Sequence, residues 1–182
     1  MADILFLCTG NVCRSPSAEL LLDRQFSQSG HHDHVVQSAG TLGVPFGPPE
    51  RLVTEAQAFG IDLSGHISRK MTTEMIDSAD LIVGMAREHV REVVLASAPS
   101  FGKTFTLREI VRRGQELGPR AAGTPMSDWL ARLHDGRRHA DLIGDSRVDD
   151  IVDPMGGSGD DYRRMLKDVS ALIESLGQLA WP

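Results

Sequence analysis

The stretch "DILFLCTGNVCRSPSAE", residues 3–19, combines the patterns of a strand, a loop and a helix start. Its apolar start, 3–7, is typical of a buried strand, and 8–15 follow as a loop that contains a glycine. Pro16 then opens a helix whose apolar residues recur at helical spacing up to Phe26. The N–H groups of such a loop and helix N-terminus point inward, so this stretch predicts an anion-binding site.

The rest of the chain continues the alternation of strands and helices. Further strands are predicted at 33–40, 79–85 and 102–107, and further helices at 50–59, 71–78, 86–97 and about 160–176. Strands that alternate with helices form βαβ units, which build a parallel sheet covered on both faces. We therefore predict an α/β fold, a three-layer sandwich with a four-stranded parallel sheet.

The segment 108–150 interrupts this alternation. It is polar and carries many of the arginines, and we predict a loop, a helix near 126–134 and another loop. A solvated helix face explains the arginine-rich run 108–138, and recognition of acidic or phosphorylated partners is the alternative. Because 182 residues suit one core rather than two, we predict a single domain over 1–182 with 108–150 as an inserted segment.

Charge and composition exclude several classes of function. The formal net charge of -6 argues against nucleic-acid or membrane binding, and no apolar run approaches the length of a membrane span. The N-terminus lacks the basic region of a signal peptide, so we expect a cytoplasmic protein with reduced thiols. Two cysteines are too few for a disulfide scaffold or a structural zinc site, and "HHDH" at 31–34 is interpreted as a solvated turn.

Cys8 directly follows the first predicted strand, so its sulfur should lie at the base of the anion site. The loop amides, the helix dipole and Arg14 favour the thiolate, which is the reactive form of cysteine. The planar fork of Arg14 can hold two phosphate oxygens. Cys8 is therefore predicted to be a nucleophile directed at phosphorus, the alternative being that both cysteines are only small buried side chains. The loop does not match the nucleotide-binding pattern G-x-x-x-x-G-K-[ST].

Three blocks carry a resemblance to a known family: "CTGNVCRSPSAE" (8–19), "QSAGT" (37–41) and "VDPMG" (152–156). With its C-x5-R-S loop near the N-terminus and its Asp-Pro pair before the last helix, the sequence resembles the low-molecular-weight protein tyrosine phosphatases. The resemblance implies a phosphomonoester hydrolase, specifically a protein-tyrosine phosphatase that works through a phosphocysteine. It also implies that no metal or cofactor is needed and that the partner is a phosphorylated protein.

The resemblance assigns the chemical steps to three residues. Cys8 attacks phosphorus, Arg14 binds the substrate and stabilises the transition state, and Asp153 is first the acid and then the base. Asp149 and Asp150 are competing acids, and a plain Asp-Pro turn is the alternative reading of Asp153. The implied phosphate-binding loop is Thr9, Gly10, Asn11, Val12, Cys13, Arg14 and Ser15.

The resemblance also implies supporting roles. Ser15 would donate its hydroxyl to the Cys8 thiolate. Asn11 would hold the loop in a left-handed conformation, with Ser38 and His66 as hydrogen-bond partners. Cys13 would form a reversible disulfide with Cys8 under oxidation, which makes the pair a redox-sensitive site. The alternatives are that Ser38 merely ends a strand and that His66 is a surface loop residue.

The sequence departs from the family at the pocket mouth, where aromatic residues are expected. Leu42 and Gly43 stand after the second block and Met155 after the Asp-Pro pair, with Phe46 as a nearby substitute. Ala86 replaces an expected acidic residue. The reaction should therefore be retained, with weaker stacking on a phosphotyrosine ring.

Two competing functions follow from the same residues. A non-catalytic module that binds phosphorylated proteins is one, because the pocket wall has diverged. An arsenate reductase is the other, although that activity needs two further cysteines and none follows Cys13.

Overall fold

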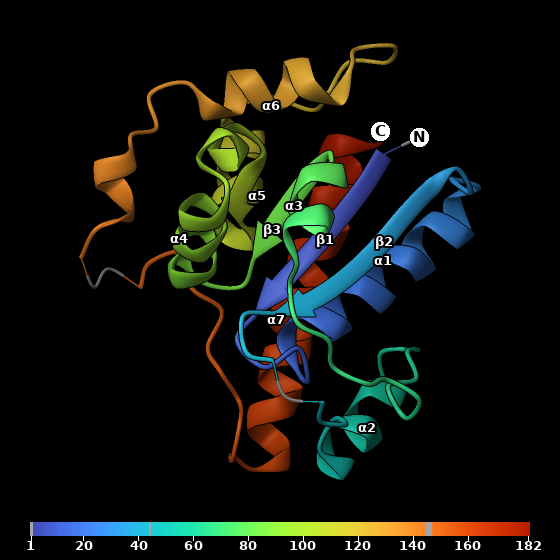
Figure 1. Ribbon diagram of the computed structural model, residues 1–182. Helices are drawn as coiled ribbons and strands as arrows, with labels where there is room; N and C mark the ends of the chain where they lie inside the picture. The colour runs from blue at the N-terminus through green and yellow to red at the C-terminus, as the bar shows by residue number, and fades with distance from the viewer. Residues whose placement is uncertain (1, 44, 145–146) are drawn as a thin grey trace.

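The computed structural model describes residues 2–43, 45–144 and 147–182. Four parallel strands form a sheet in the order β2-β1-β3-β4 (Figure 1). The strands are β1 (Ala2–Cys8), β2 (His34–Gly40), β3 (Leu81–Gly84) and β4 (Thr104–Thr106). The helices are α1 (Arg14–Ser29), α2 (Glu50–Gln57), α3 (Thr73–Ser78), α4 (Arg87–Ala96), α5 (Leu107–Leu117), α6 (Met126–His134) and α7 (Gly159–Ala180), with short 3₁₀ turns η1 (Ala98–Lys103) and η2 (His139–Leu142). The predicted fold class is confirmed.

Helices cover both faces of the sheet, which gives the three layers. On one face, Ile4 and Phe6 of β1 join a buried cluster with apolar residues of α1, α2, α5 and α7. On the other face, Leu5 and Leu7 pack with residues of α3 and α4. The alternation along β1 follows from the two-residue period of a strand, since successive side chains point to opposite faces. A strand buried on both faces is uniformly apolar, as residues 4–7 are.

The carboxyl ends of the central strands meet at one edge of the sheet. Cys8 pairs with Gly40 of β2, and Leu7 pairs with Gly84 of β3. A Cβ atom on Gly40 would lie 2.7 Å from the carbonyl oxygen of Thr9 and 3.0 Å from the amide of Asn11. Glycine is therefore required at 40, because the loop after β1 passes directly over it. Helix α1 begins at Arg14, so Pro16 lies inside its first turn rather than opening it.

The prediction of a loop from 108 onward is wrong, because α5 occupies Leu107–Leu117. The hydroxyl of Thr106 caps this helix by accepting a hydrogen bond from the amide of Glu109 at 3.1 Å. The buried face consists of Leu107, Ile110, Val111 and Gly114, at helical spacing. The predicted helix near 126–134 is confirmed as α6.

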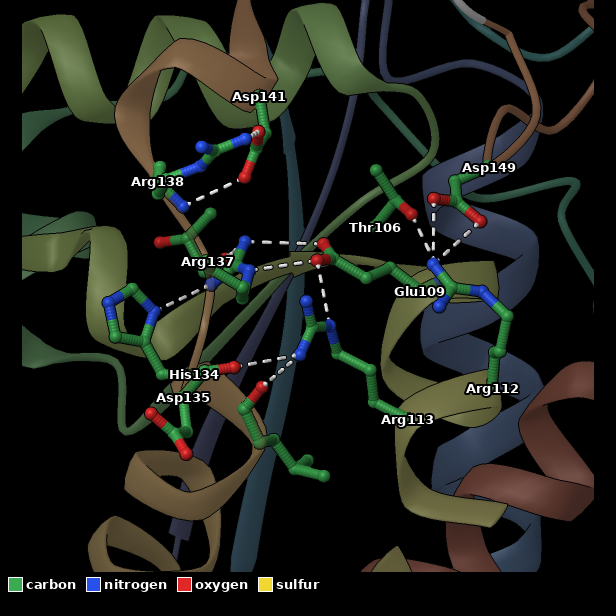
Figure 2. A network of polar contacts seen from close by, with 12 residues as sticks. Thr106, Glu109, Arg112, Arg113, His134, Asp135, Arg137, Arg138, Asp141 and Asp149 are labelled. Atoms are coloured by element: carbon green, nitrogen blue, oxygen red, sulfur yellow. Dashed lines mark hydrogen bonds and ion pairs between the residues drawn. The ribbon is translucent and has the colours of Figure 1, made fainter. Parts of the chain in front are cut away.

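Arg137 attaches the segment after α6 to the rest of the molecule (Figure 2). Its side chain is 3% exposed and forms an ion pair with Glu109 at 2.8 Å. It also donates to the carbonyl oxygens of Phe101 and Thr104, at 3.1 and 2.7 Å, and its guanidinium lies 4.0 Å from the centre of the Phe105 ring. The interpretation of the arginine-rich run 108–138 as a solvated face is therefore wrong for Arg137, which is buried and structural. The division of the chain into a single domain stays a prediction.

Within the described residues, no helix is long and apolar enough to cross a membrane, and no group of three or more His, Cys, Asp or Glu side chains could hold a metal ion. In the "HHDH" stretch, Nδ1 of His34 accepts a hydrogen bond from the amide of Ala2 at 2.9 Å, and its ring packs against Phe26 and Trp181. That histidine is thus part of the packing at the start of the sheet.

Candidate active site

The loop between β1 and α1 wraps around the sulfur of Cys8. Cys8 is 2% exposed and lies at the base of the loop. The amide of Asn11 donates to its sulfur at 3.2 Å, and the hydroxyl oxygen of Ser15 lies 2.9 Å from it. The Cys8 sulfur therefore lies within hydrogen-bond distance of a loop amide, close to the start of α1 at Arg14.

Asn11 holds the loop in this shape from inside. Its φ of 52° is left-handed, and among the described residues it is the sole non-glycine with a positive φ. Its side-chain amide donates to the hydroxyl of Ser38 at 2.7 Å and to that of Ser15 at 3.1 Å, while its side-chain oxygen accepts from the amide of Arg69 at 3.0 Å. Nε2 of His66 lies 2.7 Å from the carbonyl oxygen of Asn11. The structure therefore brings together the predicted supporting residues and adds Arg69, which the sequence analysis missed.

The hydroxyl of Ser15 has one proton and two possible acceptors for it. The oxygen already accepts from the side chain of Asn11, so its own proton is free to donate. The sulfur of Cys8 lies at 2.9 Å and the carbonyl oxygen of Ala39 at 3.4 Å. The shorter contact favours donation of the Ser15 proton to the sulfur of Cys8. Such a hydrogen bond would stabilise a thiolate at Cys8.

Arg14 and Asp153 form an ion pair of 2.6 Å at the mouth of the loop. Arg14 is buried, whereas the side chain of Asp153 is 47% exposed. Arg14 also donates to the carbonyl oxygen of Ile151 at 3.3 Å. The two competing acids face elsewhere: Asp149 pairs with Arg112 at 3.1 Å, and Asp150 accepts from the amide of Arg87 at 2.8 Å. Asp153 is thus the acid that the fold brings to the loop.

Cys13 is a buried free thiol, as is Cys8. Burial, followed by the charges of Cys8 and Asp153, raises the pKa of Cys13 from 9.0 to about 12, and Arg14 opposes this only in part. Cys13 is therefore a neutral thiol at physiological pH, and of the two cysteines it is the less suited to act as a nucleophile.

Above the loop lies a pocket of about 480 Å³ whose lining is mainly apolar. The loop forms its base, and its walls include Leu42, Phe46, Pro49 and Met155. Phe46 is 58% exposed, so its ring is accessible to a ligand. Among the lining residues that the structure describes, Asp153 is the one with an acidic side chain. The arrangement can hold an oxyanion at the base and a flat apolar group above it.

The sequence model of the family described as low molecular weight phosphotyrosine protein phosphatase matches residues 3–117. The chain belongs to this family. The match includes the loop that holds Cys8 and Arg14, and it ends before Asp153. The chain is therefore a phosphatase of the cysteine-dependent, low-molecular-weight class.

Similar proteins cover most of the chain. The protein-arginine-phosphatase of Bacillus subtilis (strain 168) is 28% identical over 176 residues, which are 97% of this chain and 95% of that protein. The low molecular weight protein-tyrosine-phosphatase Etp of Escherichia coli (strain K12) is 38% identical over 103 residues, 56% of this chain and 66% of its own length. A solved cysteine-to-serine mutant of the YwlE arginine phosphatase, with a phosphorylated active-site serine, superimposes with a TM-score of 0.70 at 28% identity, over 96% of this chain and 92% of that one.

Proposed function

We propose that this chain hydrolyses phosphotyrosine in proteins, with Cys8 as the nucleophile. The observation that carries the proposal is the buried Cys8 sulfur, which the amide of Asn11 and the hydroxyl of Ser15 contact, together with the Arg14–Asp153 pair beside it. A thiol nucleophile, a cation for the phosphate oxygens and an acid within reach of the leaving oxygen are the three groups that a two-step transfer uses.

In the first step, the Cys8 thiolate attacks phosphorus, the bond from phosphorus to the tyrosine oxygen breaks, and Asp153 gives its proton to that oxygen. In the second step, Asp153 takes a proton from water, the water oxygen bonds to phosphorus, and the sulfur–phosphorus bond breaks. Ser15 stabilises the thiolate that leaves, since its hydroxyl lies 2.9 Å from the sulfur. Arg14 holds the phosphate oxygens throughout, which requires that its 2.6 Å contact with Asp153 opens when substrate enters.

The pocket walls support an aromatic substrate. A phenyl ring gains from apolar contact with Leu42, Phe46 and Met155, all more than half exposed at the rim. Phosphoarginine is the second candidate, because the nearly full-length match to a protein-arginine-phosphatase favours it. A guanidinium group needs acceptors, and Asp153 is the carboxylate that the described pocket offers. The apolar walls therefore favour phosphotyrosine.

The reaction is tested with p-nitrophenyl phosphate in EDTA, under reducing conditions. We expect turnover by the native chain, none by Cys8→Ser, and strongly reduced turnover by Asp153→Ala. Asp149→Ala is the matched control, because this acid pairs with Arg112 and should leave turnover near the native level. A folded native chain without turnover would leave a phosphoprotein-binding module as the remaining reading.

Substrate choice is tested with two peptides of one sequence that carry either phosphotyrosine or phosphoarginine. We expect a higher kcat/KM on phosphotyrosine. Phe46→Ala should raise KM for that peptide more than for the phosphoarginine peptide, because a phenyl ring buries more apolar surface against Phe46 than a phosphorylated guanidinium group does. A higher kcat/KM on phosphoarginine would replace the proposed substrate with the second candidate.

A further inference from the structure

His89 is fully buried behind the phosphate-binding loop, although no step of the proposed reaction uses it. It lies in the first turn of α4, and its Nδ1 lies 2.9 Å from the backbone nitrogen of Ala86. A backbone N–H can only donate, so Nδ1 must be the unprotonated nitrogen. In the neutral ring the proton is therefore on Nε2, which lies 3.1 Å from the hydroxyl oxygen of Thr9 and donates to it.

The hydroxyl of Thr9 uses all of its hydrogen-bonding capacity, as one donor and two acceptor positions. It receives the proton of His89 Nε2, and it receives a second hydrogen bond from the guanidinium of Arg14 at 3.3 Å. Its own proton points to a carboxylate oxygen of Glu88, also at 3.3 Å. A hydroxyl has one proton and two lone pairs, so these three contacts saturate it. One lone pair is thereby directed at Arg14.

Arg14 thus donates hydrogen bonds to two neutral acceptors of the protein, the hydroxyl of Thr9 and the carbonyl oxygen of Ile151. Its third partner, Asp153, occupies the same terminal nitrogen as Thr9. When substrate phosphate takes the place of Asp153, the two neutral acceptors remain to set the plane of the guanidinium. A planar fork binds two oxyanion oxygens only when that plane is correct.

We propose that His89 and Thr9 are positioning residues that orient Arg14 for phosphate binding, with His89 acting through Thr9. The inference rests on the role proposed above for Arg14. Sequence reasoning gave no indication of it, since His89 is eighty positions from Thr9 and belongs to none of the family blocks.

The chemistry of His89 suits a fixed donor rather than a titrating group. Burial, and after it the charge of Arg14, lowers the pKa of His89 from 6.5 to about 3. The ring is therefore neutral at physiological pH, and its 3.4 Å contact with the exposed carboxylate of Glu88 is not an ion pair. A doubly protonated ring would also set a second donor against the N–H of Ala86. The alternative is that His89 only fixes the start of α4 through that N–H.

Two pairs of variants separate these roles. His89→Asn keeps an acceptor near the N–H of Ala86 and removes the donor to Thr9, whereas His89→Gln offers an amide donor toward Thr9 and removes the acceptor. Thr9→Val removes the hydroxyl at nearly constant shape, and Thr9→Ser keeps it. For each variant we would measure the Kd of inorganic phosphate, kcat and KM on p-nitrophenyl phosphate, and the melting temperature.

Thr9→Val should weaken phosphate binding and kcat/KM roughly tenfold or more, because a hydrogen bond to a charged group is lost, and Thr9→Ser should restore both. His89→Asn should lose roughly three- to tenfold, because Thr9 keeps its hydroxyl but loses the contact that orients it, and His89→Gln should lose less. If His89 acts through Thr9, the double variant Thr9→Val with His89→Asn is no worse than Thr9→Val alone.

Additive losses in the double variant would overturn the proposal, and so would a His89→Asn protein that melts earlier but binds phosphate normally. If the His89 variants fail to fold, equal phosphate affinity of Thr9→Val and Thr9→Ser is the overturning result. The phosphate Kd does not need turnover. A native chain that binds phosphate but hydrolyses nothing would therefore contradict the proposed function, while the variant series would still decide the positioning of Arg14.

Discussion

Replacement of Asn11 tests how the phosphate-binding loop is held open. Asn11→Ala removes three side-chain hydrogen bonds, to the hydroxyls of Ser15 and Ser38 and from the amide of Arg69. The site is fully buried, so water cannot replace them, and each is worth about 1 kcal/mol. Alanine at φ 52° costs about 1 kcal/mol more. The expected loss of unfolding free energy is therefore about 4 kcal/mol.

The assay is urea unfolding followed by tryptophan fluorescence, with phosphate affinity measured on the same samples. Asn11→Gly is the matched control, because glycine loses the same hydrogen bonds but adopts a positive φ freely. It should be more stable than Asn11→Ala by about 1 kcal/mol, while both variants lose phosphate affinity. A loss below about 1.5 kcal/mol for alanine, with normal phosphate binding, would refute the view that this side chain maintains the loop.

Three further predictions follow. The unfolding free energy should fall as the pH drops from 6.5 toward 3, because His89 has a pKa of 6.5 in the unfolded chain and about 3 in the folded chain. Denaturant titrations at several pH values would measure this fall. The fall should be smaller in His89→Asn. Arg137→Met should lower the unfolding free energy by about 3 kcal/mol without changing KM, because Glu109 loses its 2.8 Å partner while it keeps the 3.3 Å pair with Arg113, and the carbonyl oxygens of Phe101 and Thr104 lose a donor. An unchanged urea unfolding midpoint would contradict the structural role of Arg137. Iodoacetamide at pH 8 should label Cys13 more slowly than Cys8 in the folded protein, because a pKa of about 12 keeps Cys13 a neutral thiol. Fragment mass spectrometry distinguishes the two labelled cysteines. Faster labelling of Cys13 would contradict this prediction.

The base of the site could be predicted because its parts are contiguous in the sequence. A strand, a loop and a helix start lie within residues 3–19, so their order alone places Cys8 under the loop amides. Asp153, Ser38 and His66 are distant in sequence, and only the family resemblance assigned them. Their meeting depends on the strand register and on loop paths that no local pattern encodes.

Other features were missed for different physical reasons. Helix α5 carried its own signals, a capping Thr106 and apolar residues at helical spacing, but the polar composition of the segment and the Gly/Pro-rich 118–125 that follows led to a loop prediction. His89 and Arg69 left no signal that could have been used. His89 reaches the loop because β3 lies beside β1 in the sheet, so α4 begins next to Thr9. The contact of Arg69 with Asn11 depends on the path of the chain between α2 and α3.

The most direct test of the central claim is mass spectrometry of enzyme quenched in acid during turnover of p-nitrophenyl phosphate. Asp153→Ala should be used beside the native chain, because loss of the base slows the second step and lets the intermediate accumulate. We predict one added phosphoryl group on the peptide that contains Cys8, with none in Cys8→Ala, whose side chain cannot accept a phosphoryl group. Turnover without phosphorylation of Cys8, or with the phosphoryl group on another residue, would contradict the account.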